Sequence, residues 1–497
     1  MIMTSVTLVA LLMLLDTSIV VTAIPRITSQ FHSLADVGFA YQLACAELQP
    51  LTGRIYMNLD SKWTFMGFFF VFEVGSLICA VSTSSKMLTV GRAIAGIGTS
   101  GILNGAFTII SGCVPMSRRP TMLGLVMGVS QVVGGALTEY TTWRWCFYIN
   151  LPIGGLVAIL LVFVRIPEQI PKAKFTSAIR TLPPKLDLIG FALFAPAAIE
   201  LLLALQHGGN QFTWHSSQVI GLFCGADVTF IAFLAWDYYK GDAAMIPFSM
   251  IRRKIVWSSS LTYGLLMGQI FCASYYLPIY FQGVKGASPM MSGVYVLPSI
   301  LAHLFVALVS GKIVERVGYY PPIIVVSAAG MAIANGLLST LAPHTSTGKW
   351  IGYQILLGAA RGLDPVTTTN PRPQPIIAVQ NVLPPPQIPV ATALVMFSQT
   401  FAGALFSQFL GHHLHEQSQY SRAAICPECG SPDHHQCRRY GIPIGSSGSE
   451  LANVVIAYAK SVDRVFYLTT GMACGCFLFS WAMGWKDIRK KNMVSKA

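Results

Sequence analysis

The sequence predicts an all-α polytopic membrane protein, and three observations support this prediction. Of the 497 residues, 53% are hydrophobic and 11% are charged, a balance unlike that of soluble globular chains. Apolar runs of the ~20 residues that a helix needs to cross a ~30 Å hydrocarbon core recur along the whole chain. The first run, 4–24, ends before Pro25 and holds one carboxylate, Asp16, near its middle.

We expect fourteen transmembrane helices, an even number that places both chain ends on one side of the membrane. The predicted spans are 4–24, 38–56, 63–82, 88–114, 120–140, 146–166, 187–207, 217–237, 257–281, 289–311, 322–342, 350–382, 388–410 and 465–485. The first run exceeds a signal-peptide core and has no basic residues before it, so we interpret it as an uncleaved span.

These spans divide the chain into three parts. Residues 1–166 form an N-terminal six-helix bundle, and residues 167–256 form cytoplasmic linkers with two inserted transmembrane helices. Residues 257–497 form a C-terminal six-helix bundle, with a long outer loop at 411–464 and a cytoplasmic tail.

The basic residues orient the spans. The chain has 33 Lys and Arg against 20 Asp and Glu, a formal net charge of +13. About two thirds of the Lys and Arg fall in the loops on the N-terminal side and in the C-terminal tail, so the positive-inside rule makes both ends cytoplasmic. Because these charges lie scattered between apolar runs and not on a polar domain, we expect the lipid bilayer as a partner and no nucleic acid.

Asp16 and Arg92 are charges inside predicted spans. A charge near the bilayer centre costs a few kcal/mol at least, so it usually faces a protein interior or a wet cavity and marks an ion or substrate path. Asp16 is therefore a candidate proton-titrating group of a transporter. The alternative is an Asp that only fixes helix packing. Arg92, one turn inside the fourth span, needs an acid or a water-lined cavity.

Two similar segments indicate an internal repeat. Residues 53–62 (GRIYMNLDSK) follow the second span, and 311–318 (GKIVERVG) follow the tenth. Each follows the second helix of a six-helix set if 187–237 is an inserted pair. Two homologous halves around a midplane site are typical of a transporter. The chain also has no nucleotide-binding loop, HExxH or GxSxG motif, so we expect no enzyme.

Several segments resemble motifs of the major facilitator superfamily. Residues 15–25 (LDTSIVVTAIP) resemble the first-helix motif of its fourteen-helix drug/proton antiporters, and 91–98 (GRAIAGIG) resemble their fourth-helix motif. Residues 141–154 are similar to the fifth-to-sixth junction of fungal toxin-efflux pumps. Residues 311–318 look like the superfamily's cytoplasmic Gly-x-Leu-x-Asp-Arg-x-Gly loop. The resemblance covers nearly the whole chain and implies the major facilitator fold.

The resemblance also implies a function. It implies proton-coupled efflux of toxic small molecules or secondary metabolites by alternating access, without a cofactor. The partners would be protons and a small hydrophobic or amphipathic substrate, and the location the plasma membrane, with a vacuolar or vesicle membrane as the alternative. The alternative functions are uptake of siderophores or other small molecules by a relative of the same superfamily, and a non-functional product of a damaged gene.

The resemblance assigns roles to individual residues. Proton coupling is implied near Asp16 and Arg92, with a static ion pair as the alternative. Glu73 lies on a helix that is peripheral in this superfamily, so we favour a structural role for it. The candidate gating residues of the two cytoplasmic loops are Gly53, Arg54, Gly311, Glu315, Arg316 and Gly318.

Four polar side chains are candidates for the substrate cavity. They are Tyr275, Tyr276, Gln354 and Gln399. The tyrosines belong to an aromatic run that an interfacial belt would also explain. The glutamines would equally serve hydrogen bonding between helices.

The chain departs from the family pattern at three informative places. Met57 replaces the usual acid of the first cytoplasmic loop, and 128–135 in the fifth helix lacks the expected Gly-Pro. In the twelfth helix, 364–374 carries three prolines and cannot continue a helix through lipid. We interpret helices five and twelve as atypical through mis-splicing. A re-entrant loop at 364–374 is the alternative, and a product that does not fold is a competing reading.

The cysteines give little functional signal. Most of the 11 lie in apolar runs, where they are typical of small buried hydrophobes. In the predicted outer loop, Cys426, Cys429 and Cys437 lie near two histidines with the reach of a zinc site. A disulfide or an irregular insertion is the interpretation we prefer there, and we expect no metal.

Overall fold

The computed structural model describes most of the chain, and almost all of the described part is helical. The ranges that it leaves undescribed are 1–4, 7, 10–11, 14–15, 17–34, 114–143, 164–165, 167–182, 210–211, 288, 318–320, 364–373, 426–447 and 484–497. Within the described residues the one β-bridge, between Gly208 and Phe212, belongs to no strand. The predicted all-α class is confirmed.

The main helices follow one another along the described chain. They are α2 (Ala35–Asn58), α3 (Ser61–Ala80), α4 (Ser85–Cys113), α7 (Asn150–Phe163), α10 (Leu188–His207), α11 (Ser217–Lys240), α13 (Lys254–Gly283), α14 (Pro289–Val317), α15 (Pro321–Leu338), α16 (Thr347–Leu363), α18 (Ile388–Ile425) and α19 (Gly448–Ser480). The short segments are α6 (Trp145–Tyr148), α9 (Pro183–Leu186), α12 (Phe248–Ile251), α17 (Gln374–Val382) and the 3-10 turns η1 (Gly241–Ala243), η2 (Pro385–Gln387) and η4 (Trp481–Met483).

These helices lie at the predicted spans. Each span from 38–56 onward has a helix at its place, except that 120–140 lies outside the described residues. In the first span the structure describes only residues 5–6, 8–9, 12–13 and 16, and all of them are helical. In the described part, 7 helices are long and apolar enough to cross a membrane by length and composition. Others are shorter, such as α7 with 14 residues.

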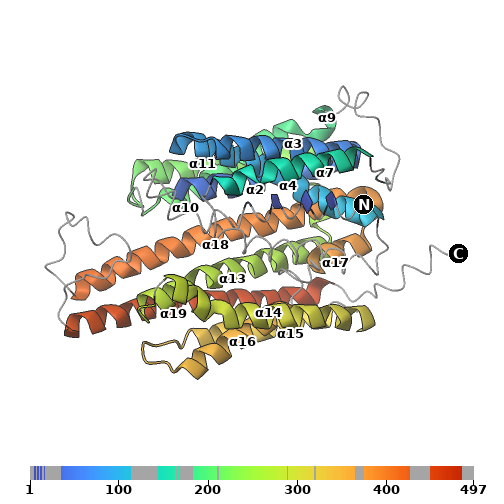
Figure 1. The fold of residues 1–497 in the computed structure, drawn as a ribbon. Coiled ribbons are helices and arrows are strands. Elements are labelled where there is room, and N and C mark those ends of the chain that lie inside the picture. The colour runs from blue at the N-terminus through green and yellow to red at the C-terminus, as the bar shows by residue number, and fades with distance from the viewer. Residues whose placement is uncertain are drawn as a thin grey trace.

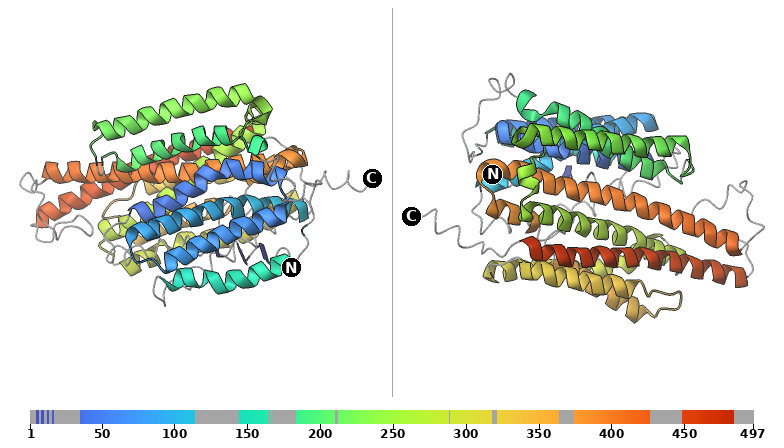
Figure 2. Two further views of the ribbon diagram at one scale, coloured as in Figure 1. Left: turned by 90° about the horizontal axis from the view of Figure 1, so that it is seen from above. Right: turned by 180° about the vertical axis from the view of Figure 1, so that it is seen from behind.

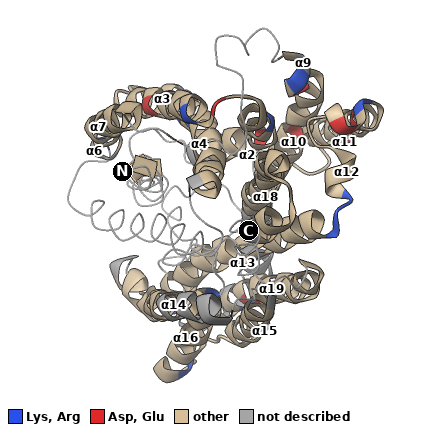
Figure 3. Ribbon diagram, turned by 90° about the vertical axis from the view of Figure 1, so that its right-hand side faces the viewer, with Lys and Arg blue, Asp and Glu red and all other residues tan. Residues whose placement is uncertain are grey.

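The long helices run side by side in two groups (Figures 1 and 2). In the first group α4 packs on α2 and on α3, and α7 packs on α3. In the second group α14 packs on α16, and α19 packs on α13 and α15. The end-on view in Figure 3 separates the two groups clearly. Helix α18 joins them, because it packs on α13 and also along α2.

Helices α10 and α11 form a pair at the edge of the first group. They pack on each other, and α10 also contacts α2 and α18. Side-chain caps fix where each begins: Asp187 accepts a hydrogen bond from the backbone N–H of Gly190, and Ser216 accepts one from Val219. Only 17% of the apolar window of α11 is buried within the protein, so most of this helix faces outward, as expected beside lipid.

Much of the segment 411–464, predicted as an outer loop, is helical. Helix α18 continues to Ile425 and α19 already begins at Gly448, so helix replaces loop on both sides of 426–447. Residues 412–425 contain no Pro or Gly, and a polar helix persists in water when its residues are good helix formers. The 38 residues of α18 extend about 57 Å, well beyond a ~30 Å hydrocarbon core.

The interrupted twelfth span appears as two helices with different neighbours. Helix α16 packs on α14 and α15, whereas α17 packs on α13 and α18. Residues 364–373 between them lie outside the described residues. The predicted interruption falls on these residues and stays a prediction, and α17, which follows them, contacts the helix that joins the two groups.

Candidate coupling and gating site

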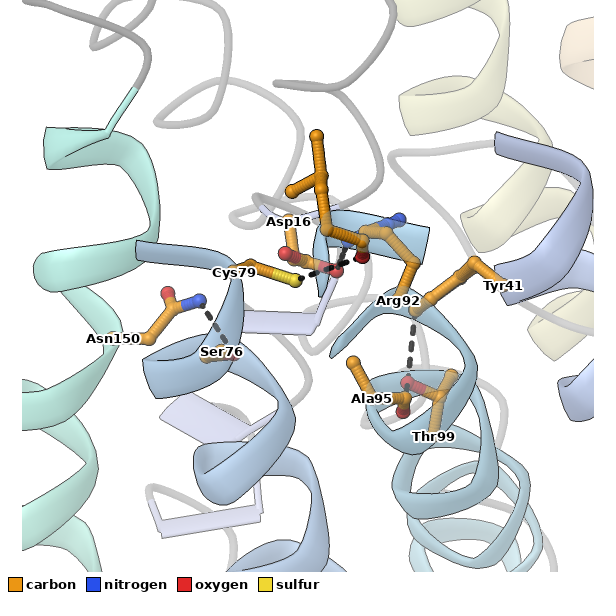
Figure 4. Close-up of polar contacts among 9 residues, drawn as sticks. Asp16, Tyr41, Ser76, Cys79, Arg92, Ala95, Thr99 and Asn150 are labelled. Atoms are coloured by element: carbon orange, nitrogen blue, oxygen red, sulfur yellow. Dashed lines mark hydrogen bonds and ion pairs between the residues drawn. The ribbon is translucent and has the colours of Figure 1, made fainter. Parts of the chain in front are cut away.

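Asp16 and Arg92 form an ion pair inside the first helix group. The Nη1 of Arg92, on α4, donates to the Oδ2 of Asp16 at 2.5 Å. Their side chains are 1% and 0% exposed respectively. Figure 4 shows the two side chains meeting between α3 and α4. A charge pair this deep in a membrane protein is costly to form, so it is typical of a functional position.

Aromatic rings surround the Arg92 guanidinium. Its carbon lies 4.1 Å from the ring centroid of Tyr41 and 5.9 Å from that of Phe147, both within the range of cation–π attraction. The Tyr41 hydroxyl lies 2.8 Å from Thr99 Oγ1, and the Thr99 hydroxyl in turn donates to the carbonyl of Ala95. Helix α2 therefore contacts the ion pair directly through Tyr41.

The glycines of 91–98 position Arg92 by letting α4 approach its neighbours. A Cβ at Gly91 would lie 2.8 Å from the sulfur of Cys79, on α3. A Cβ at Gly96 would collide with the backbone carbonyl of Tyr41, and one at Gly98 with the backbone of Phe72. Small residues at such spacing permit close helix packing in membranes. The motif thus has a steric reason: it places Arg92 between α2 and α3.

The ion pair keeps unused hydrogen-bonding capacity. Among the described residues, Asp16 Oδ1 and Arg92 Nε have no hydrogen-bond partner. A carboxylate oxygen in this condition can accept a further hydrogen bond or a proton. The pair is therefore able to change its bonding without unfolding its surroundings.

Glu73 lies on α3, where it contacts α7 and not the Asp16–Arg92 pair. Its carboxylate faces Gly154 on α7, where an added Cβ would collide with it. One turn further along, Asn150 Nδ2 donates to Ser76 Oγ at 3.3 Å. Glu73 thus belongs to the contact between α3 and α7 at the edge of the group. The preferred structural role of Glu73 stays a prediction.

Gly53 lies where α2 meets the start of α18. A Cβ on Gly53 would stand 2.8 Å from Val390 Cα and 2.8 Å from the Cβ of Ala393. Only a glycine allows this approach. The contact lies at the predicted cytoplasmic end, and it closes the two helix groups against each other there.

Arg54 ties α2 to the segment after α11. Its Nη2 donates to the carbonyl of Asp242 at 2.9 Å and to that of Ala244, and its Nε donates to Met245 at 3.4 Å. Asp187 holds the same segment, because its carboxylate accepts from Met245 N–H and from Trp236 Nε1, each at 2.8 Å. No sequence pattern predicts the contact between Asp187 and Trp236, because it joins segments distant along the chain.

The predicted loop at 53–62 is wrong in its first half. Helix α2 continues through Arg54 to Asn58, and only Leu59 and Asp60 separate it from α3. Asp60 caps α3 by accepting from Trp63 N–H at 3.1 Å. No Pro follows Gly53 before this cap, so the helix has no local reason to end earlier.

The corresponding segment of the second half is also helical. Gly311, Glu315 and Arg316 lie in the last turns of α14, which ends at Val317, and so the prediction of a loop there is wrong. Helix α14 continues past residue 311, where the hydropathy pattern predicts that the span ends. Gly318 lies outside the described residues. The gating roles of all four residues stay predictions.

The substrate-cavity candidates fall in different surroundings. Tyr276 is 1% exposed and packs with Cys272 and Val465, whereas its neighbour Tyr275 is 64% exposed on the other side of α13. Gln354 is buried and donates from Nε2 to the carbonyl of Tyr295 at 2.9 Å. Their roles stay predictions, and the geometry favours the buried residues over Tyr275.

Gln399 lies on α18 in the half-buried part of that helix. Its Oε1 has no hydrogen-bond partner within the described part of the chain. Helix α18 packs on both groups, so Gln399 lies on the helix that joins them.

The structure has long apolar helices in two groups and an ion pair buried within one group. A close glycine contact joins α2 to α18. These features are typical of a membrane transport protein. The chain belongs to the Major Facilitator Superfamily, whose sequence pattern it matches over residues 6–407. It is accordingly a multi-pass membrane protein that transports a small molecule across a membrane, rather than an enzyme.

Fungal transporters are similar over almost the whole chain. The MFS-type transporter pigP of Monascus ruber is 56% identical, with 98% of this chain and 86% of that protein covered. The efflux pump mlcE of Penicillium citrinum is 45% identical, with 99% of this chain and 91% of that protein covered. The efflux pump mokI of Monascus pilosus is 44% identical, over 97% and 91% respectively.

Solved structures share the fold at low sequence identity. The structure of the proton:xylose symporter XylE matches with a TM-score of 0.62 and 15% identity, over 98% of this chain and 96% of that one. The human organic anion transporter MFSD10 matches with a TM-score of 0.58 and 13% identity, over 95% and 98%. These likenesses confirm the major facilitator fold.

Proposed function

We propose that this protein exports small hydrophobic or amphipathic secondary metabolites from a fungal cell in exchange for protons. The observation that carries the proposal is the fully buried Asp16–Arg92 pair, whose carboxylate keeps one oxygen without a partner in the described part of the chain. Relatives named efflux pumps, such as mlcE and mokI, support the outward direction. We propose the plasma membrane as the location.

Protonation of Asp16 is the step that would couple the gradient to movement. A neutral Asp16 no longer attracts the guanidinium of Arg92, so Arg92 is left to its aromatic neighbours and to water. One of these neighbours is Tyr41 on α2, so a shift of Arg92 changes the packing between α4 and α2. A proton can bias two conformations only through such a difference in interaction energy between them.

Helix α2 would carry this change to the gate. It contacts the ion pair through Tyr41, and the contact between Gly53 and α18 lies further along the same helix. Separation of that contact opens the space between the groups toward the cytoplasm, where cargo enters. Closure followed by opening on the other side releases the cargo outside, and the inward proton gradient makes this cycle run in one direction.

The test compares export by the wild-type protein and two variants. Asp16→Asn keeps side-chain volume and hydrogen bonding but cannot titrate, so gradient-driven export should be lost while expression remains. Glu200→Gln makes the matched change on α10, against Gly225 of α11, and should export normally. The producing fungus is grown with each variant, and lipophilic metabolites in cells and in medium are measured by mass spectrometry.

The same experiment reads the direction of transport. An exporter predicts that metabolites accumulate inside cells that lack the protein, whereas an importer predicts their depletion there. Full export by Asp16→Asn, or export that survives collapse of the gradient by a protonophore, would remove proton coupling through Asp16.

A further inference from the structure

Glu47 is a second acid in the membrane interior that the coupling step above does not use. It lies on α2 and is 5% exposed. Neither of its carboxylate oxygens has a hydrogen-bond partner among the residues that the structure describes. The sequence offered no role for it, because an acid in an apolar run does not reveal which neighbours it faces.

The surroundings of Glu47 follow from the residues one turn away on each side. Leu43 packs against an apolar cluster that holds Leu202 of α10 and Ala404 of α18. Leu51 belongs to a cluster that holds Phe194 of α10, and Phe397 of α18 packs against that cluster. Residues four apart share one face of a helix. Glu47 therefore lies on the face of α2 that contacts both α10 and α18, between two layers of apolar side chains.

Three of the charged groups around α2 make contacts elsewhere. On α4, Arg92 binds Asp16, and on α2 itself Arg54 binds carbonyls of 242–245. On α10, Glu200 faces Gly225 of α11, and α18 has no ionisable side chain over 388–406. Among the residues whose side chains the structure describes, the other ionisable residues on α2 and on the helices that pack against it are Tyr41, Cys45, Tyr56, Lys62, Glu73, Cys79, Lys86, Lys185 and His207.

Burial without a partner decides the protonation of Glu47 in this closed arrangement. An ionised carboxylate in an apolar interior is so unfavourable that the group takes up a proton instead. A neutral carboxyl is far less costly, and its hydroxyl can bond to the backbone of its own helix. When α2 and α18 separate and water reaches the carboxyl, the ionised form becomes favourable again.

We propose that Glu47 is a second proton-carrying group of the transport cycle, protonated while α2 is closed on α18 and ionised when that contact opens to water. This inference rests on the proposed proton-driven export. Each cycle then binds one proton at Glu47 from outside, carries it on the neutral carboxyl, and releases it to the cytoplasm, which restores the carboxylate.

The level of Glu47 on α2 suits exposure to both sides in turn. It lies six residues from Gly53, about 9 Å along the helix, and eight residues from Phe39, about 12 Å along it. Gly53 contacts α18 near the cytoplasmic end, and Phe39 packs with Ala404 of α18 on the opposite side. Opening at either end would bring water toward the same carboxyl.

The experiment follows the opening of the contact between α2 and α18 as a function of pH. Val390→Cys places a thiol at a 4% exposed position beside Gly53. The full-length protein is reconstituted in nanodiscs, and the rate of maleimide labelling at position 390 is measured from about pH 6 to about pH 8. Labelling of the protein with Val390 intact is subtracted to remove the native cysteines.

The comparison is made between backgrounds, so the titration of the thiol itself cancels. A single linked proton changes the opening equilibrium by up to about tenfold per pH unit. Glu47→Gln should lose that part of the pH dependence, while Glu200→Gln, the same change elsewhere on the helices, should retain it. Glu47→Asp keeps a titratable group and should restore the dependence, at a shifted midpoint.

The outcomes separate this proposal from the proposed function. If Glu47→Gln labels with the wild-type pH dependence while Asp16→Asn flattens it, Glu47 is overturned and coupling through Asp16 stands. If neither variant changes the dependence, both proposals fail. If Glu47→Gln folds poorly, Glu47→Asp still decides: a profile identical to wild type with an unshifted midpoint overturns the proposal.

Discussion

Two of the buried polar clusters among the described residues, one in each half, differ in charge. In the first half Asp16 and Arg92 form an ion pair under the ring of Tyr41. In the second half Asn335 Nδ2 donates to Gln269 Oε1 at 3.5 Å, and Gln269 Nε2 lies 3.4 Å from the sulfur of Cys476. The second cluster holds its helices together with amides, which do not titrate.

We infer from this difference which of the two clusters would respond to protons. Losing or gaining a proton changes an ion pair by a full charge, whereas an amide network keeps its hydrogen bonds at any physiological pH. The first cluster thus suits coupling and the second suits a fixed scaffold. The predictions below test that division, beginning with the largest expected effect.

Arg92→Gln should be the most damaging change. It leaves the Asp16 carboxylate buried without its charge partner, which should lower the free energy of unfolding by about 3–5 kcal/mol. The double variant Asp16→Asn/Arg92→Gln removes both charges and should regain most of that stability without regaining export. Thermal unfolding of the purified protein measures the first effect, and metabolite export measures the second. Equal stability of the single and double variants would contradict a buried charge pair.

Gly53→Val should come next. The added side chain meets Val390 and Ala393 across the contact with α18, so the cytoplasmic end cannot close as observed. Export should fall strongly while the protein still folds, because the clash is relieved by separation of the helix groups. Gly67→Ala is the matched control, since nothing lies within 4 Å of its added Cβ. Normal export by Gly53→Val would show that this contact is not a gate.

The sequence predicted the helices well and their ends poorly. Apolar runs locate spans because lipid demands apolar side chains, but Asn58, Val317 and Ile425 lie beyond the predicted ends. Helical propensity continues into water wherever no Pro or cap intervenes, and hydropathy does not report this.

The site was predictable only where a rare residue type marks it. Charges in apolar runs predict Asp16 and Arg92 as candidate coupling residues, and the structure pairs them. By contrast, the bonds from Asp187 to Trp236 and Met245 join common residues from three segments, and only the packed fold reveals them. The face of α2 that carries Glu47 was unpredictable for the same reason.

Gln269→Leu should have a smaller and purely structural effect. It removes the hydrogen bond to Asn335 and leaves that amide unsatisfied, a loss of about 1–3 kcal/mol. The pH dependence of export should stay that of the wild type, because no titratable group is lost. Thermal unfolding and export at two pH values measure both points. A changed pH profile would break the proposed division between the two clusters.

Deleting the predicted insertion 364–374, which includes the first residue of α17, should have the smallest effect on the site and a visible effect on yield. These residues separate α16, on α14 and α15, from α17, on α13 and α18. The sequence predicts that this segment, with three prolines, cannot continue a helix through lipid, where each unpaired backbone group costs several kcal/mol, on the order of a hydrogen bond lost. Joining Leu363 directly to Pro375 should remove that cost, so more protein should reach the cell surface, measured by surface labelling. If the segment is instead a functional re-entrant loop, trimming leaves surface yield unchanged and reduces export. Unchanged yield together with unchanged export would contradict both readings and make the segment a tolerated cytoplasmic loop.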